Sequence, residues 1–161
     1  MVKVVTIQVV LIVSISRNWD IRQLDVNNVF LNGTLQVAVC IAQPEKYVDA
    51  LKPNHVCKLN HALYRLKQAP ITWFDKLRVA LIKWVFQNLR FDIFLFIFNL
   101  NGKIIYFLVY IDDIMIIRND ELLLHKLTSD LNDEFALKKL GQIHYFLGIE
   151  MHHDAIELYL I

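Results

Sequence analysis

Residues 104–117 form a long apolar run that is broken only by two adjacent carboxylates, Asp112 and Asp113. β-Branched and aromatic residues dominate it, without alternation of apolar and polar positions. This pattern predicts two buried strands joined by a tight turn at the aspartates, with both faces of the sheet covered. Two like charges at such a tip repel each other and lose hydration, so they need cations or strong donors nearby. Because Asp is also a common turn residue, the run alone fits both a metal site and a solvent-facing turn.

Two other segments repeat apolar residues at three- and four-residue spacing, which is helical periodicity. We expect a helix over 70–86, which Pro70 opens at a position where its missing N–H costs nothing. A second helix is expected over 120–135, with Asn119 or Asp120 as its cap. The predicted buried positions are Trp73, Leu77, Ala80, Leu81 and Trp84 in the first helix and Leu123, Leu124, Leu127 and Leu131 in the second.

Short β-prone segments between turn residues predict the remaining strands. Residues 2–16 are rich in Val and Ile, so propensity favours a strand there, with a buried helix as the alternative. Absence of repeats, low-complexity tracts and linkers indicates one domain over 1–161. Strands are expected at 21–26, 37–42, 56–59, 91–99, 145–151 and 155–160, with His152, His153 and Asp154 at the bend between the last two.

The composition favours a domain that has neighbours. A chain of 161 residues is long enough for one core, and 56% of its residues are hydrophobic, which suggests that other domains cover part of its surface. A formal net charge of +1 provides no global basic field for a nucleic acid. Cys40 and Cys57 lack metal-site spacing and are expected to be free thiols. The apolar N-terminus is similar to a signal-peptide core but falls short of the ~20 apolar residues that span a bilayer, so a secreted or membrane protein is a remote alternative.

Three carboxylates on neighbouring strands would form a binding site for divalent cations. Asp25 lies near the end of the expected strand 21–26, and Asp112 and Asp113 lie at the tip of the expected hairpin. Such a trio can hold two divalent cations about 3.5–4 Å apart, which clamp both oxygens of an in-line phosphoryl displacement. Mg²⁺ suits the site because it prefers oxygen ligands and shares its shell with substrate phosphates. The acids would act as ligands and must stay ionised.

Four motifs occur in a fixed order along the chain: residues 23–33 (QLDVNNVFLNG), 62–70 (ALYRLKQAP), 110–113 (YIDD) and 145–150 (YFLGIE). Together they closely resemble the successive motifs of the reverse transcriptase of copia-type LTR retrotransposons. The resemblance covers residues 2–160.

The resemblance implies an α+β fold, with a polymerase palm-like antiparallel sheet backed by helices (a partial right-hand polymerase fold) and a helix over 2–16. It implies an RNA-directed DNA polymerase that uses two Mg²⁺ ions to transfer a nucleotide from a dNTP to a primer 3′-OH. The implied partners are an RNA template, a DNA primer, a dNTP and the remaining Pol domains (fingers, thumb and RNase H), with no membrane. The implied location is a cytoplasmic virus-like particle or the nucleus, without secretion.

The resemblance also assigns roles to individual residues. The implied metal ligands are Asp25 and Asp112, with Asp113 as the third acid, and the backbone carbonyl of Val26. The remaining implied contacts are Phe30 under the nucleotide sugar, Gln68 on the dNTP, Lys67 near its phosphates, Tyr110 and Ile111 at the primer end, Phe146, Leu147 and Gly148 as the primer grip, and Lys138 as the proton donor to pyrophosphate. Taken alone, Phe30 also fits a plain core residue and Lys138 a solvated lysine.

The chain departs from the family pattern at Arg65, at Ile71 and over 34–38. Because the start of the fingers, the thumb and the RNase H domain are expected to be absent, we expect little activity from this chain alone. A non-catalytic remnant that retains only the palm fold is therefore the alternative function.

Overall fold

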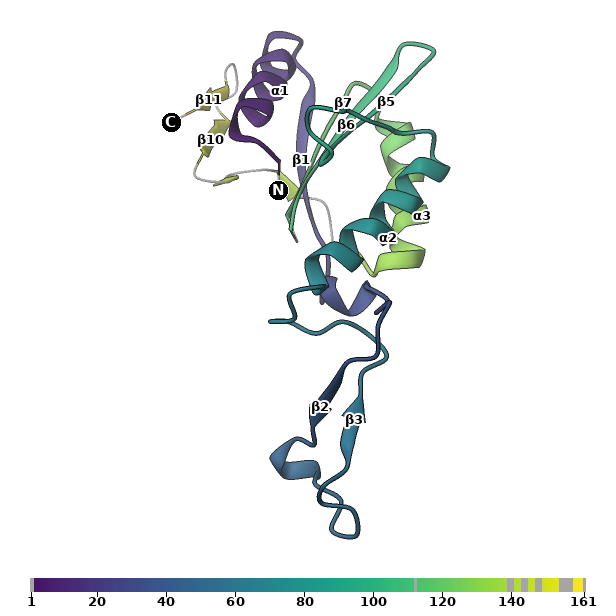
Figure 1. The fold of residues 1–161 in the computed structure, drawn as a ribbon. Helices are drawn as coiled ribbons and strands as arrows, with labels where there is room; N and C mark the ends of the chain where they lie inside the picture. Colours follow the sequence, from purple (N-terminus) through teal and green to yellow (C-terminus); the bar gives the residue numbers. More distant parts are fainter. Residues whose placement is uncertain are drawn as a thin grey trace. The chain divides into compact units, whose positions relative to one another are not determined.

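The structure is a computed structural model that describes residues 2–111, 113–138, 141–142, 145–146, 149–153 and 158–160. The chain forms two compact units, one made of Met1–Asn27 and Ala80–Ile161 and the other of Asn28–Val79. The fold is α+β (Figure 1).

The first unit is built on a six-stranded antiparallel sheet with the order β4-β5-β6-β7-β1-β8. A separate three-stranded sheet has β10 between β9 and β11. The elements of this unit are α1 (Val4–Ser16), β1 (Asp20–Asp25), β4 (Gln87–Asn88), β5 (Leu95–Leu100), β6 (Lys103–Tyr110), β7 (Asp113–Arg118), α3 (Glu121–Phe135), β8 (Gly141–Gln142), β9 (Tyr145–Phe146), β10 (Ile149–His153) and β11 (Leu158–Leu160).

The second unit contains a two-stranded antiparallel ladder and most of one helix. Gly33 lies against Thr72 and Trp73 so closely that a Cβ atom at this position would collide with the Thr72 side chain. Cys40 and Cys57 are both free, as predicted. The elements are η1 (Val29–Asn32), β2 (Cys40–Ala42), η2 (Glu45–Tyr47), β3 (Val56–Lys58) and α2 (Ala69–Lys83), whose last turn belongs to the first unit.

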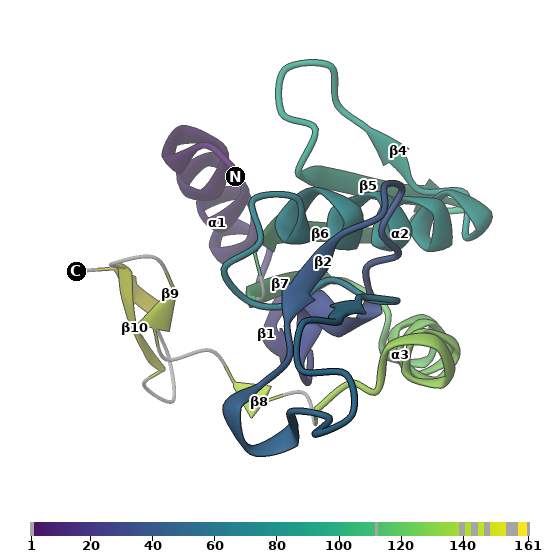
Figure 2. The same cartoon turned by 60° about the horizontal axis from the view of Figure 1, so that its bottom comes forward.

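The predicted central hairpin is confirmed, and both faces of its sheet are covered. Tyr110 pairs with Asp113 across the β6–β7 connection, and every residue from 114 to 118 is buried. Helix α1 and helix α3 lie on opposite faces of the sheet (Figures 1 and 2). Met115 and Ile117 belong to the core on the α1 face. On the opposite face, the Phe86 ring lies 6.1 Å from the Phe107 ring between centroids.

Helix α1 forms where propensity alone favours a strand, which confirms the helix implied by the resemblance. Its Ile7 and Leu11 are fully buried in the core of the first unit, and the Ser14 hydroxyl donates a hydrogen bond to the Val10 carbonyl at 2.6 Å. Tertiary packing of one helix face outweighs the weak β preference of Val and Ile. The other side of α1 leaves Val4, Val5, Val9 and Ile12 more than half exposed.

Helix α3 begins and ends where the sequence predicts. The Asp120 carboxylate accepts a hydrogen bond from the Leu123 backbone N–H at 2.8 Å, which is an N-terminal cap. Leu124, Leu127 and Leu131 are buried as expected, whereas Leu123 is only half-buried.

Helix α2 begins one residue earlier than predicted, at Ala69, and ends at Lys83 rather than at Phe86. The Phe86 N–H donates to the Leu81 carbonyl and the Val85 N–H to the Ile82 carbonyl, which is a Schellman motif. Trp84 therefore lies beyond the helix and is half-buried, so its prediction as a core residue of the helix was wrong.

Two predicted strands begin later in the chain than expected. The strand expected at 91–99 begins at Leu95, because the Asp92 carboxylate accepts hydrogen bonds from the backbone N–H groups of Lys3 and Phe94 and forms a turn there. The strand expected at 37–42 is only Cys40–Ala42.

The C-terminal strands also differ from the prediction. The expected strand 145–151 is two strands, β9 and β10, which pair with each other through Phe146 and Ile149. His152 and His153 lie within β10 opposite Tyr159 and Leu158, not at a bend. Asp154 lies outside the described residues.

Val85→Gly is expected to raise the free energy of unfolding by about 1 kcal/mol. Val85 has a backbone φ of 64° and a side chain that is 67% exposed. A β-branched residue is strained in this left-handed conformation, and glycine removes the strain while little buried surface is lost. Urea denaturation followed by circular dichroism measures the change.

Val79→Gly is the matched control, because Val79 is an exposed valine in the interior of α2. It is expected to lower the free energy of unfolding by about 1 kcal/mol. Equal destabilisation by the two substitutions would contradict the role assigned to Val85.

Protonation of Asp120 is expected to weaken the cap of α3. The hydrogen bond from the Lys103 side chain, followed by that from the Leu123 N–H, lowers the pKa of Asp120 from its ordinary value of 3.8. A lowered folded pKa contributes stability above the unfolded pKa, and this stability is lost as the pH falls through the folded value. The difference in urea midpoint between the wild type and Asp120→Asn should therefore shrink between pH 6 and pH 3. A constant difference would show that the carboxylate charge does not stabilise the cap.

Candidate active site

The end of β1 and the start of β7 bring two carboxylates together. Asp25 and Asp113 are direct partners in the antiparallel β1–β7 ladder. Direct partners project to the same face, with Cβ atoms about 4.5–5.5 Å apart. Both residues are half-buried. The hairpin and the first acidic strand, which are far apart in sequence, thus present two acids at one place.

The two acids belong to a row that crosses three strands. Asp113 pairs with Tyr110 on one side and with Asp25 on the other. Because side chains alternate along a strand, this row lies on the sheet face that carries Met115 and Ile117. The core on that face also contains Phe146, and the partly buried Tyr110 packs against this core. The structure therefore places Tyr110 and Phe146, two of the residues predicted to border the primer, on the same face as the acids.

Lys138 contacts Asp25 twice. Its backbone N–H donates to the Asp25 carbonyl at 2.9 Å, and its Nζ donates to the Asp25 carboxylate oxygen Oδ2. An isolated bridge between Val26 and Leu137 holds the two segments together. The Lys138 and Asp25 side chains are 54% and 46% exposed. Lys138 therefore forms an ion pair with Asp25 while its side chain is still half exposed, so its role as a proton donor stays a prediction.

Gln23 is a polar neighbour that the sequence reasoning gave no role. Its side-chain amide donates a hydrogen bond to Asp113 Oδ1 at 3.0 Å. Gln23 lies two residues before Asp25 and therefore on the same face of β1. The period of two along the strand was the signal that could have identified it.

The β6–β7 connection contains a strained residue. Ile111 has a φ of 57°, a left-handed conformation that costs a β-branched residue roughly 1–2 kcal/mol. Such strain recurs at functional sites, where the surrounding structure holds it in place. Asp112, the other residue of the connection, lies outside the described residues, as do Leu147 and Gly148.

Three predicted site residues belong to the second unit. Phe30 is 8% exposed, and its ring packs edge-on against Tyr64 with centroids 4.6 Å apart. Lys67 and Gln68 are exposed immediately before α2, and the Gln68 carbonyl accepts the Thr72 N–H at 3.0 Å. Buried Phe30 is compatible both with a rigid wall below a nucleotide and with a plain core residue, so its role stays a prediction.

The donor set fits a hard divalent cation in its chemistry. Within the described part of the chain, no three His, Cys, Asp or Glu residues form a cluster that could hold a metal. Asp112, the third predicted ligand, is not among those residues. Asp25 and Asp113, which are partners in the ladder, supply carboxylate oxygens, the ligands that Mg²⁺ prefers, and the Lys138 ammonium group lies against Asp25.

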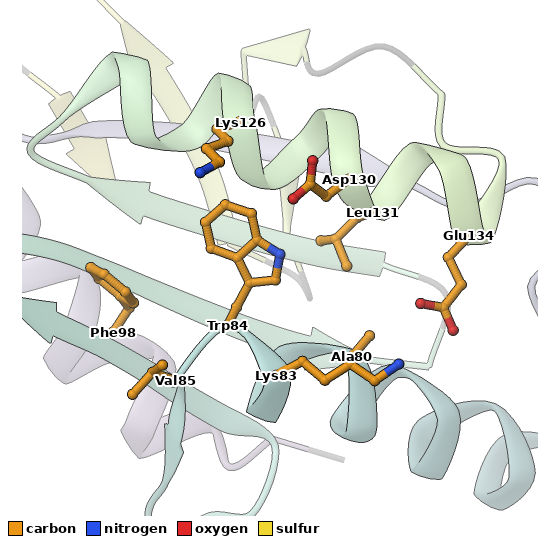
Figure 3. A pocket seen from close by; sticks show the side chains of 9 residues that line it. All are labelled: Ala80, Lys83, Trp84, Val85, Phe98, Lys126, Asp130, Leu131 and Glu134. Atoms are coloured by element: carbon orange, nitrogen blue, oxygen red, sulfur yellow. The ribbon is translucent and has the colours of Figure 1, made fainter.

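A hollow of about 530 Å³ lies between the end of α2 and α3, away from the row of Asp25, Asp113 and Tyr110 (Figure 3). Trp84 projects into it, with the Lys126 ammonium 5.6 Å from the centroid of the Trp84 ring. Lys83, Asp130 and Glu134 complete a rim of mixed charge. The hollow shares no residue with the carboxylate row, so we assign no part of the site to it.

Comparison with known proteins identifies the class. The whole chain, residues 1–161, matches the family model described as reverse transcriptase (RNA-dependent DNA polymerase). The chain therefore belongs to the reverse transcriptase family, which confirms the resemblance found in the sequence motifs.

The relatives specify the branch. The chain is 46% identical over 159 residues to the retrovirus-related Pol polyprotein from transposon RE1 of Arabidopsis thaliana, covering 99% of this chain and 11% of the relative. It is 46% identical over 149 residues to that from transposon RE2 of the same plant, covering 92% of this chain and 10% of the relative. It is 36% identical over 152 residues to that from transposon TNT 1-94 of Nicotiana tabacum, covering 93% and 11%. The chain is thus a copia-type reverse transcriptase sequence that spans about a tenth of the length of these relatives. None of the described helices has the length and apolar character needed to cross a membrane.

Proposed function

We propose that the chain forms the palm-like part of an RNA-directed DNA polymerase, and that Asp25, Asp113 and Asp112 hold two Mg²⁺ ions at its centre. The observation that carries the proposal is the direct pairing of Asp25 with Asp113, in a row with Tyr110. Two carboxylates from separate strands at one place match the ligand arrangement of a phosphoryl-transfer site.

Bound Mg²⁺ would activate the primer 3′-hydroxyl and neutralise the charge of the leaving pyrophosphate. The residues of the chain would hold the metal ions and orient their ligands. Asp25 and Asp113 supply ionised oxygens, with the Val26 carbonyl as an additional ligand, and the Gln23 amide fixes the orientation of the Asp113 carboxylate. Lys138, hydrogen-bonded to Asp25, is the proposed proton donor to pyrophosphate.

The remaining proposed roles concern substrates. Tyr110 and Ile111 border the primer end, and Phe146, Leu147 and Gly148 grip the primer strand. In the second unit, Gln68 and Lys67 contact the incoming dNTP. Phe30 excludes the 2′-hydroxyl of an rNTP, and the edge-on contact with Tyr64 supports this role because it restricts the movement of the ring.

The proposed partners are an RNA template, a DNA primer, a dNTP and the other domains of a Pol polyprotein. The small share of the relatives that the chain covers supports a role as one part of a larger polymerase. The proposed location is a cytoplasmic virus-like particle or the nucleus.

Asp25→Asn and Asp113→Asn should each reduce nucleotide incorporation at least about 100-fold, because each removes a ligand charge. The assay is single-nucleotide extension of a DNA primer on an RNA template, with Mg²⁺ or Mn²⁺ and the chain in excess over primer. Excess chain makes a slow reaction measurable. Asp130→Asn on α3 is the matched control and should retain wild-type incorporation.

Each other outcome of this assay has a defined meaning. Incorporation that survives both Asp25→Asn and Asp113→Asn would refute the proposed site. A folded wild-type chain that incorporates nothing under any of these conditions would favour the non-catalytic remnant.

Phe30→Leu should raise the ratio of rNTP to dNTP incorporation by about tenfold. The substitution removes the ring that opposes the 2′-hydroxyl while it retains an apolar side chain at a position that is 8% exposed. Phe91→Leu, at a side chain that is 84% exposed, is the control and should leave the ratio unchanged. An unchanged ratio in a folded Phe30→Leu chain would show that Phe30 is only a core residue.

A further inference from the structure

We propose that Lys138 is an internal counter-ion of this site: its ammonium group occupies Asp25 in the metal-free chain, and a divalent cation displaces it. The inference rests on the proposed function, because it takes Asp25 as a metal ligand. It predicts that Lys138 sets the metal affinity of the site, a role beyond proton donation.

Two backbone contacts restrict how far Lys138 can move from Asp25. Its N–H donates to the Asp25 carbonyl at 2.9 Å, and the preceding residue, Leu137, forms the bridge to Val26. The Cα atom of Lys138 is thereby fixed beside the end of β1. Only the side chain is left to adopt an engaged or a displaced position.

The charges explain why the engaged position is favoured without metal. Like charges directly opposite one another destabilise an antiparallel pair, and Asp25 and Asp113 are such a pair. An ammonium group on Asp25 reduces this repulsion. The nearby Arg22 and Arg118 do not take this role, because both donate to Asp20, whose side chain projects from the other face of β1.

The same contact is weak enough to be displaced. Both side chains are about half exposed, and exposed ion pairs contribute little because solvent screens them. A divalent cation carries twice the charge of an ammonium group and prefers carboxylate oxygens. Lys138 also borders a hollow of about 350 Å³ whose lining includes Thr128 and Asn132 of α3, so a displaced side chain has room.

The test is direct binding of Mn²⁺ to the whole chain, titrated by electron paramagnetic resonance without nucleic acid or nucleotide. Lys138→Met should lower the dissociation constant for Mn²⁺ about fivefold, because the metal no longer competes with an ammonium group for Asp25. Lys103→Met is the matched control, since the Lys103 side chain is 48% exposed, close to the 54% of Lys138, and forms an ion pair with Asp120 at 2.8 Å. It removes the same charge and should change the affinity less than about twofold.

A double-mutant cycle separates competition from general electrostatics. In the Asp25→Asn background, Lys138→Met should no longer tighten Mn²⁺ binding, because the contested carboxylate is gone. Equal tightening in both backgrounds would overturn the proposal, since Lys138 would then act only through its charge.

The remaining outcomes distinguish this proposal from the proposed function. Binding that depends on Asp25 but is unaffected by Lys138→Met would overturn the counter-ion role and leave the proposed function standing. If no folded variant bound Mn²⁺ in an Asp25-dependent way, the metal role of Asp25 and the counter-ion role would both be refuted. Circular dichroism establishes that each variant is folded.

Discussion

The register of the β1–β7 ladder is the constraint on which the candidate site depends. Asp25 lies opposite Asp113 only because Ile21 lies opposite Ile117, and that apolar pair is buried beneath α1. A slip of one residue would move every side chain of β1 to the other face, separating the carboxylates and exposing the apolar positions together. Hydrophobic burial at one end of the ladder therefore fixes the position of charge at its other end.

Much of the first unit could be predicted from the sequence because its signals are local and strong. The β-branched and aromatic run over 104–117 predicted the β6–β7 hairpin, and the Asp120 cap defines the start of α3. Failures occurred where a tertiary contact or backbone geometry decided the outcome. Asp92 holds the Lys3 and Phe94 amides and delays β5, while the Schellman turn at Val85 shortens α2.

Prediction of the site was limited in a similar way. Motif order identified the acids, and strand pairing then brought Asp25 and Asp113 together. The Lys138–Asp25 contact could not be derived from spacing, because it depends on how the segment after α3 crosses the end of β1. Gln23 could have been identified from the sequence, since it shares a strand face with Asp25. The predicted roles of all the site residues, the acids as well as Phe30, Lys67 and Gln68, stay predictions.

Helix α1 has apolar residues on both of its sides, and only one side is buried. Its exposed residues Val5, Val9 and Ile12 follow a spacing of four and three, so they form a continuous stripe along the helix. Exposure of this stripe to water is unfavourable in free energy, and an apolar surface that covers the stripe would remove this cost. In a preparation of the purified chain, the stripe of a second copy can provide this surface. Self-association of the chain should therefore increase with protein concentration and with salting-out ions.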